Sequence, residues 1–194
     1  KKDLSKEAKA ISVMKPRVFY IADSLGDLNI KKLKSISVII KKYWNGEIGI
    51  HAHNNLNFAL KNSKFAIKEG FTWIDSTLMG MGRGAGNLRT EDLLKVIAKY
   101  KITKNFQNFQ KSFMTSLKKL YNWGPNKYYK FSAMCQIHPT YVQEMLSDER
   151  YSNNKIISIL KKIKNTNSYN PDIIENLSQR KFGNQNVLNF KKIN

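Results

Sequence analysis

Three short apolar runs alternate with segments of helical periodicity in the first hundred residues. The runs cover residues 17–22, 47–52 and 71–74, and each ends in polar residues. Continuously apolar runs of this length are typical of parallel strands that are covered by helices on one side and packed on the other. We therefore predict three neighbouring strands of a parallel sheet.

The intervening segments predict helices. Apolar residues recur at spacings of three and four in the segments 30–43, 56–69 and 88–100, and residues 5–14 fit the end of a preceding helix. Gly70 is expected to end the helix 56–69, because glycine is favoured just beyond a helix. Strands that alternate with helices in this order predict an α/β fold.

The number of strands indicates how much of a closed barrel is present. A (β/α)₈ barrel needs about 250 residues, and residues 1–104 supply about three of its eight βα units. We predict that this segment is the C-terminal part of a TIM barrel. A doubly wound open sheet is the structural alternative, because three strands fit both architectures.

Helices without strands are predicted from residue 105 onward. They cover 105–121, 139–147, 153–164 and 171–179, with a loop rich in Tyr, Gly and Pro over 121–131. We predict that residues 105–194 form a small helical appendage packed on the barrel.

The net charge of +20 raises the question of a nucleic-acid partner, because basic residues neutralise phosphates. Only five of the 34 basic residues are arginine, and all are spread along the chain. Base readout favours clustered arginine with stacking aromatics. We expect no nucleic-acid partner, and a basic nucleic-acid-binding module is the alternative from another functional class.

Other compositional features favour a reduced, cytoplasmic protein without a membrane partner. No uncharged run approaches the roughly 20 residues of a membrane span, and no signal-peptide pattern opens the chain. The single cysteine, Cys135, forms no internal disulfide.

His51-Ala52-His53 is the most informative motif. Residues i and i+2 of a strand point to the same side, and barrel active sites lie at the C-terminal ends of strands. Two neutral imidazoles bind Zn²⁺, Mn²⁺, Fe²⁺ or Co²⁺. The alternative is a pair of histidines satisfied by hydrogen bonds at a strand end. Asp23-Ser24 and Asp75 end the other two runs, which fits a pocket rim or helix N-capping.

A glycine-rich segment, residues 80–87, precedes the helix 88–100. Its glycines allow close approach of a ligand to the backbone. The segment superficially matches a dinucleotide fingerprint, but Lys99-Tyr100-Lys101 stands where that motif requires an acidic residue. The nicotinamide interpretation is therefore excluded.

Four motifs in this order resemble the metal-dependent aldolase/lyase superfamily, over about residues 5–100. They are YIADSLG (20–26), GIHAHNNL (49–56), IDST (74–77) and GMGRGAGN (80–87). The superfamily includes 4-hydroxy-2-oxovalerate aldolase, hydroxymethylglutaryl-CoA lyase and the isopropylmalate and homocitrate synthases. The resemblance implies a barrel enzyme that cleaves or forms a carbon–carbon bond in a 2-oxo acid. It also implies a divalent cation, Mn²⁺ first, with Mg²⁺, Co²⁺ or Zn²⁺ as alternatives.

By the same resemblance, His51 and His53 are metal ligands and Asn87 contributes to the metal site. Ser24 matches a residue that contacts the carboxylate of the pyruvate unit. Arg83, in the glycine-rich segment, is our own candidate for holding an anionic substrate.

The aldolase branch is favoured because residues 80–87 lack the catalytic cysteine of the lyase branch. An acyl-CoA-using synthase or lyase of the superfamily is the alternative. Tyr128 or Tyr129 is a candidate proton donor, with core packing as the alternative role, and His138 before Pro139 is expected to be a cap or turn residue.

One departure concerns the first strand of the superfamily, which supplies an Arg-Asp pair with a metal-binding Asp and has a catalytic histidine nearby. Residues 1–194 contain no candidate for these residues, and the chain begins at Lys1 rather than Met. We expect them to lie upstream of Lys1 and the isolated chain to be an inactive fragment. The aldehyde or acyl partner and the oligomeric state, with a homo-oligomer as one outcome, stay open.

Overall fold

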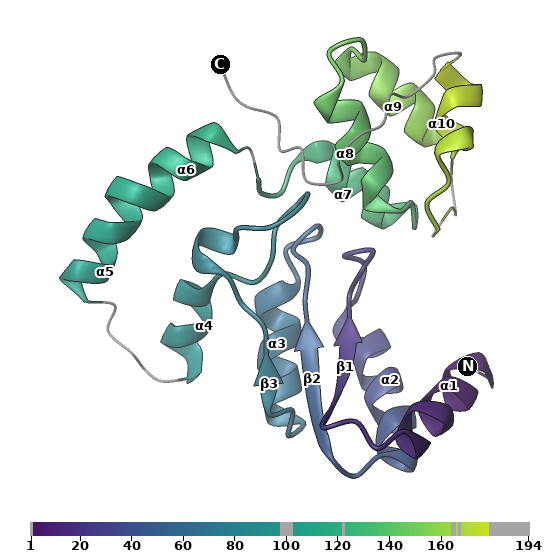
Figure 1. The fold of residues 1–194 in the computed structure, drawn as a ribbon, viewed down its shortest axis with the longest axis vertical. Coiled ribbons are helices and arrows are strands. Elements are labelled where there is room, and N and C mark those ends of the chain that lie inside the picture. The colour runs from purple at the N-terminus through teal and green to yellow at the C-terminus, as the bar shows by residue number, and fades with distance from the viewer. Residues whose placement is uncertain (1, 98–102, 122, 164–165, 167, 179–194) are drawn as a thin grey trace.

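A computed structural model describes residues 2–97, 103–121, 123–163, 166 and 168–178. It has a three-stranded parallel sheet in the order β1 (Val18–Ala22), β2 (Glu47–His51), β3 (Trp73–Ile74). The first four helices are α1 (Lys2–Val13), α2 (Ile30–Tyr43), α3 (Ala59–Lys68) and α4 (Thr90–Ile97). Figure 1 shows the arrowheads of the strands pointing toward a second group of helices. The predicted α/β class and parallel strands are confirmed.

One face of the sheet is packed and the other is open. Leu33 and Ile40 of α2 and Ile50 of β2 are buried in one apolar cluster, with at most 1% of each residue exposed. On the opposite face, Tyr20 and Trp73 are 39% and 42% exposed. The expectation that both faces are packed is therefore wrong for the described part of the chain, which leaves these two rings partly exposed.

Several predicted boundaries shift because backbone groups have other partners. The helix predicted from residue 56 begins at Ala59, because Asn57 adopts a positive φ of 60° in the turn before it. The third strand is limited to Trp73 and Ile74. The helix predicted from residue 88 begins at Thr90, because the carbonyl of Leu88 accepts a hydrogen bond from the Thr77 amide. Residues 98–100 of that prediction lie outside the described residues.

The second group of helices begins with a long helical segment. It consists of α5 (Lys104–Phe109), a π-helical turn (Gln110–Met114) and α6 (Thr115–Leu120), so the predicted helix 105–121 is confirmed except for its π turn. Four further helices are α7 (Lys127–Met134), α8 (Pro139–Ser147), α9 (Asn153–Lys162) and α10 (Pro171–Ser178). The last three match predicted helices, although predicted residues 164 and 179 lie outside the described residues. No described helix could cross a membrane.

The loop predicted over 121–131 is wrong in its second half, where α7 begins. Asn126 caps this helix, and its side-chain oxygen accepts hydrogen bonds from the amides of Tyr128 and Tyr129 at 2.9 and 3.0 Å. The helices α7–α10 surround a second apolar core that includes the fully buried residues Tyr141, Leu160 and Ile174.

We expect Asn126→Ala to destabilise the protein by about 1 kcal/mol, because the substitution removes the side-chain oxygen that caps the N-terminus of α7. Urea unfolding of wild type and variant measures this difference. Asn126→Ser restores an N-cap acceptor and should recover most of the loss. Equal stability of the alanine and serine variants would contradict the capping role.

Candidate active site

Polar residues gather where the three strands end. Ala22 pairs with His51 across β1 and β2, the Asp23 amide donates to the His51 carbonyl, and the Asp75 amide donates to the Ile50 carbonyl. The carboxyl ends of parallel strands meet at one edge, so Asp23, His51 and Asp75 follow one another across the sheet. This edge faces the second group of helices (Figure 1).

The two histidines of the His-x-His motif are neighbours, with ring centroids 4.8 Å apart and ring planes at 87°. His51 ends β2, and its Nδ1 lies 2.9 Å from Asp75 Oδ2. Nδ1 of His53 lies 2.7 Å from the Asp23 carbonyl oxygen. A carbonyl and an ionised carboxylate only accept, so each Nδ1 carries the proton and each Nε2 keeps its lone pair for a ligand. Burial lowers the pKa of His53, and the charge of Arg83 acts in the same direction, which favours the neutral form of His53.

Asp75 and Asp23 orient these imidazoles. Asp75 also accepts a hydrogen bond from the Tyr20 hydroxyl at 2.9 Å. The helix-capping alternative for Asp75 is therefore corrected to a hydrogen bond that orients His51. Asp23 is buried, which raises the pKa of its carboxyl to about 6, and its Oδ1 accepts from the Leu28 amide. Both aspartates follow strands, which was visible in the sequence, but their pairing with histidines 24 and 30 residues away in the chain was not.

Asn87 joins the histidines through the backbone. It forms an antiparallel bridge with His53, and the neighbouring Gly86 carbonyl accepts from the Asn54 amide at 3.0 Å. The side-chain Nδ2 of Asn87 donates to the Met81 carbonyl at 3.2 Å, whereas Oδ1 is buried and has no hydrogen-bond partner within the described part of the chain. An unpartnered amide oxygen on the residue bridged to His53, together with two imidazole nitrogens, is a donor set that fits a divalent cation.

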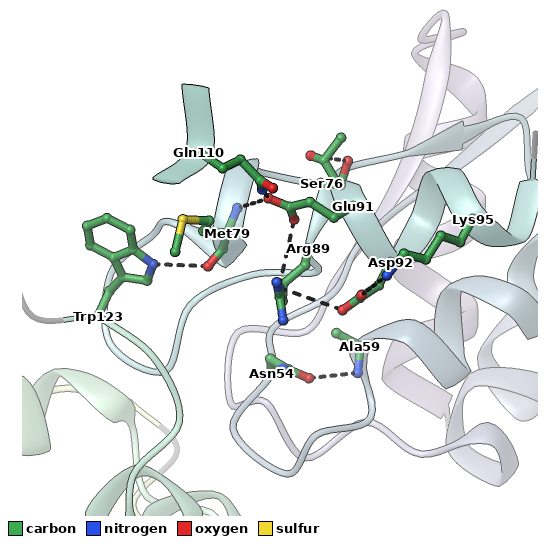
Figure 2. Close-up of polar contacts among 11 residues, drawn as sticks. Asn54, Ala59, Ser76, Met79, Arg89, Glu91, Asp92, Lys95, Gln110 and Trp123 are labelled. Carbon is green, nitrogen blue, oxygen red and sulfur yellow. Dashed lines mark hydrogen bonds and ion pairs between the residues drawn. The ribbon is translucent and has the colours of Figure 1, made fainter. Parts of the chain in front are cut away.

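Met79, directly before the glycine-rich segment, is fixed by hydrogen bonds to residues that the sequence analysis did not assign to the site. Met79 has a positive φ of 51°, and Figure 2 shows its backbone bonded on both sides. Its amide donates to the buried carboxylate of Glu91 at 2.7 Å, and its carbonyl accepts from the Trp123 indole at 3.1 Å. Gln110 of the π turn also donates to Glu91. Nothing local in the sequence indicates these contacts, because they join the loop to α4, the π turn and the segment before α7.

A cavity of about 140 Å³ adjoins His53. It is lined by Ser24, His53, Asn55, Arg83, Gly84, Ala85, His138, Pro139 and Gln143. The two residues predicted to bind substrate, Ser24 and Arg83, therefore lie on one cavity with His53. His138 is the N-cap of α8, as expected for a cap residue, and the sequence analysis did not place it or Asn55 at the site.

The two tyrosines proposed as proton donors are both buried. The Tyr128 hydroxyl donates to Asn153 inside the helical group. Tyr129 packs on the glycine-rich segment, where a Cβ added to Gly84 would lie 3.1 Å from its ring. Burial raises the pKa of Tyr129, which keeps its phenol protonated. The proton-donor role stays a prediction for both.

Within the described ranges, no three His, Cys, Asp or Glu side chains form a group that could hold a metal ion. The metal-site role of His51, His53 and Asn87 therefore stays a prediction. The fold and this site define a parallel α/β protein with a paired-histidine site at the carboxyl ends of its strands.

The chain belongs to the HMGL-like family, whose model matches residues 1–118. It is 37% identical over 108 residues to a 4-hydroxy-2-oxovalerate aldolase from Geobacillus genomosp. 3, covering 56% of this chain and 32% of that protein. The aldolase of the same name from Brevibacillus brevis is 39% identical over 94 residues, which are 48% of this chain and 28% of that protein. The chain thus spans about a third of the length of these curated relatives.

Solved structures agree with the α/β fold. The N-terminal domain of a candidate aldolase from Bacteroides vulgatus superposes with a TM-score of 0.65 and 36% identity, covering 80% of this chain and 51% of that one. The carboxyl transferase domain of Rhizobium etli pyruvate carboxylase, solved with pyruvate and biocytin, gives a TM-score of 0.60 over 77% of this chain and 26% of that one. At 10% identity, the second likeness concerns the fold alone.

Proposed function

We propose that the protein containing this chain is a divalent-metal-dependent carbon–carbon lyase of the 4-hydroxy-2-oxovalerate aldolase type. The observation that carries the proposal is the pair of histidines, whose Nδ1 atoms both lie within hydrogen-bond distance of oxygens. Asn87, which is bridged to His53, adds a buried Oδ1 without a partner among the described residues. Membership of the HMGL-like family and the aldolase relatives support the same reaction class.

The exposed sheet face supports a larger barrel fold for the complete protein. Residues 1–104 are the last βα units of a (β/α)₈ barrel, and residues 105–194 are a helical appendage. Tyr20 and Trp73 lie on the face that would line the barrel interior, so the remaining strands would bury both rings. The chain by itself, with open strand edges and an incomplete ligand set, would be inactive.

His51, His53 and Asn87 would hold the cation, with Mn²⁺ as the first choice. When bound, the cation supplies Lewis-acid stabilisation of the negative charge that develops on the 2-oxo acid. Asp75 and Asp23 keep the two imidazoles in the ligand tautomer. Ser24 lines the adjoining cavity and would contact the carboxylate of the 2-oxo acid. Arg83 lines the same cavity and would hold an anionic group of the substrate.

The proposed reaction is a retro-aldol cleavage of a 4-hydroxy-2-oxo acid. A base takes the proton of the 4-hydroxyl group, the C3–C4 bond breaks, and the released aldehyde gains its carbonyl. The electron pair of the broken bond forms the enolate of pyruvate, which is then protonated at C3. We assign the carboxylate ligand and the base to the part of the relatives that this chain does not cover, with Tyr128 or Tyr129 as alternative proton donors.

The test is pyruvate release from 4-hydroxy-2-oxovalerate by the protein that contains this chain. We expect turnover with Mn²⁺, loss of at least about 100-fold in kcat after treatment with EDTA, and recovery when Mn²⁺ is restored, because charge stabilisation at the enolate is worth several kcal/mol. Mg²⁺, Co²⁺ and Zn²⁺ are the comparison ions. Full activity after EDTA treatment would contradict the metal dependence.

A further inference from the structure

The cavity beside His53 joins two parts of the molecule. Its walls come from the strand ends, from the glycine-rich segment and from the start of α8. The described residues that line it include donors such as Ser24, Asn55, Arg83 and His138, but no Asp or Glu. A cavity with several donors and no carboxylate favours an anionic ligand.

Asn55 gives the first indication that a ligand belongs there. The residue is 4% exposed, and its amide Nδ2 has no hydrogen-bond acceptor among the residues that the structure describes. A side chain at Gly26 would come within 2.3 Å of Asn55 Cγ, so Asn55 lies tightly beneath this glycine. A buried donor without a partner costs about 1–3 kcal/mol. An acceptor that enters the cavity would remove that cost.

The start of α8 gives the second indication. The amide of Thr140 donates to Nδ1 of His138, so the proton of the neutral imidazole resides on Nε2, a donor on a residue that lines the cavity. Burial, reinforced by the charge of Arg83, lowers the pKa of His138. The nine-residue helix α8 also directs the positive end of its dipole toward the cavity.

Arg83 supplies the formal charge. Its side chain is exposed, and it forms no salt bridge with any carboxylate in the described part of the chain. An arginine without an internal partner, on a cavity without carboxylates, is suited to bind a carboxylate or phosphate in a bidentate fashion.

We propose that this cavity binds a second anionic group of the substrate, a carboxylate or phosphate at the aldehyde end, distinct from the carboxylate of the 2-oxo acid. Asn55, Arg83 and His138 would bind this second anionic group. His138 belongs to the start of α8, so the helical group would contribute to substrate specificity at the strand ends. The assignment of the anion to the substrate rests on the proposed function, whereas the anion site itself does not.

The direct test is anion binding to the metal-free protein that contains this chain, titrated calorimetrically with inorganic phosphate and with succinate in EDTA. We expect binding that weakens roughly tenfold or more in Arg83→Gln and Asn55→Leu, because each variant removes a hydrogen bond to a charged ligand. Arg17→Gln, at the opposite end of β1, is the matched control and should bind both anions like wild type. Arg83→Gln changes an exposed residue, so its result does not depend on the fold tolerating Asn55→Leu.

Absence of binding, or equal affinities in wild type and Arg83→Gln, would overturn the inference. Saturating pyruvate in the Mn²⁺-loaded protein should leave phosphate affinity unchanged. Displacement of phosphate by pyruvate would mean that the cavity is the carboxylate site of the 2-oxo acid, which would also overturn the inference.

The kinetic test compares acceptors in the aldol direction with pyruvate. Acetaldehyde is the neutral acceptor, succinic semialdehyde carries a carboxylate, and glyceraldehyde 3-phosphate carries a phosphate. The preference in kcat/KM for an anionic acceptor over acetaldehyde should fall about tenfold in His138→Asn, which keeps an N-cap but removes the imidazole donor. The preferred acceptor shows whether the second anionic group is a carboxylate or a phosphate. An unchanged ratio would overturn the role of His138, whereas inactivity with every aldehyde would contradict the proposed function and leave the binding result to decide on the anion site.

Discussion

Replacing both His51 and His53 by alanine is expected to remove the bound divalent cation and to lower kcat/KM for pyruvate formation by at least about 10³-fold. The magnitude follows from the several kcal/mol that a Lewis-acidic cation contributes to an enolate-forming transition state, since each 1.36 kcal/mol corresponds to a tenfold change in rate. The two Nε2 atoms are the nitrogen ligands that the site offers, because both Nδ1 atoms are bonded to oxygens. Metal content after gel filtration and pyruvate release measure the two effects separately.

A graded variant and a surface control strengthen this experiment. Asp75→Asn keeps an acceptor near His51 but removes its charge, and losses of such supporting partners lower metal affinity about 10–100-fold. Lys61→Ala changes an exposed residue of α3 and should keep wild-type metal content and turnover. The mechanism is wrong if the double histidine variant is folded by circular dichroism yet retains its metal and its activity.

The strand ends could be predicted because their signals are local. A spacing of two placed His51 and His53 together, and parallel strands that end in polar residues placed Asp23 and Asp75 at the same edge. The identity of the ligands rested on the resemblance of four motifs, which is more specific than any single motif. Asn87 illustrates this point, since its backbone bridge to His53 spans 34 positions and no periodicity predicts it.

The parts that the sequence did not predict depend on contacts between distant segments. The Tyr, Gly and Pro content of residues 121–131 favoured a loop, and the N-cap Asn126 was overlooked although its side chain starts α7. His138 was correctly expected to be a cap, but only the three-dimensional position of α8 places it on the same cavity as Ser24 and His53. The exposure of one sheet face was not predicted. Apolar strands indicate that both faces are buried in the complete protein, but they do not indicate which residues cover each face.

Contacts between distant segments also separate two glycines that look alike in the sequence. Gly86 and Gly70 both adopt positive φ, at 80° and 84°, which costs any other residue about 1–2 kcal/mol. A Cβ at Gly86 would also lie 2.3 Å from the Gly80 carbonyl oxygen, which accepts the hydrogen bond of the Asn87 amide. Gly86→Ala must therefore displace the backbone that holds a proposed metal-site residue. We expect a loss of about 3 kcal/mol or more in the free energy of unfolding, measured in urea, together with weaker metal binding.

Gly70→Ala is the matched control, because a Cβ at Gly70 would meet no atom within 4 Å. This variant bears only the conformational cost of a positive φ, so it should lose about 1–2 kcal/mol and bind metal like wild type. The difference between the two alanine variants isolates the contact with the Gly80 carbonyl from the preference for glycine at positive φ. Equal destabilisation, with equal metal content, would show that the glycine-rich segment tolerates a side chain at position 86 and that Asn87 does not depend on its close approach to Gly80.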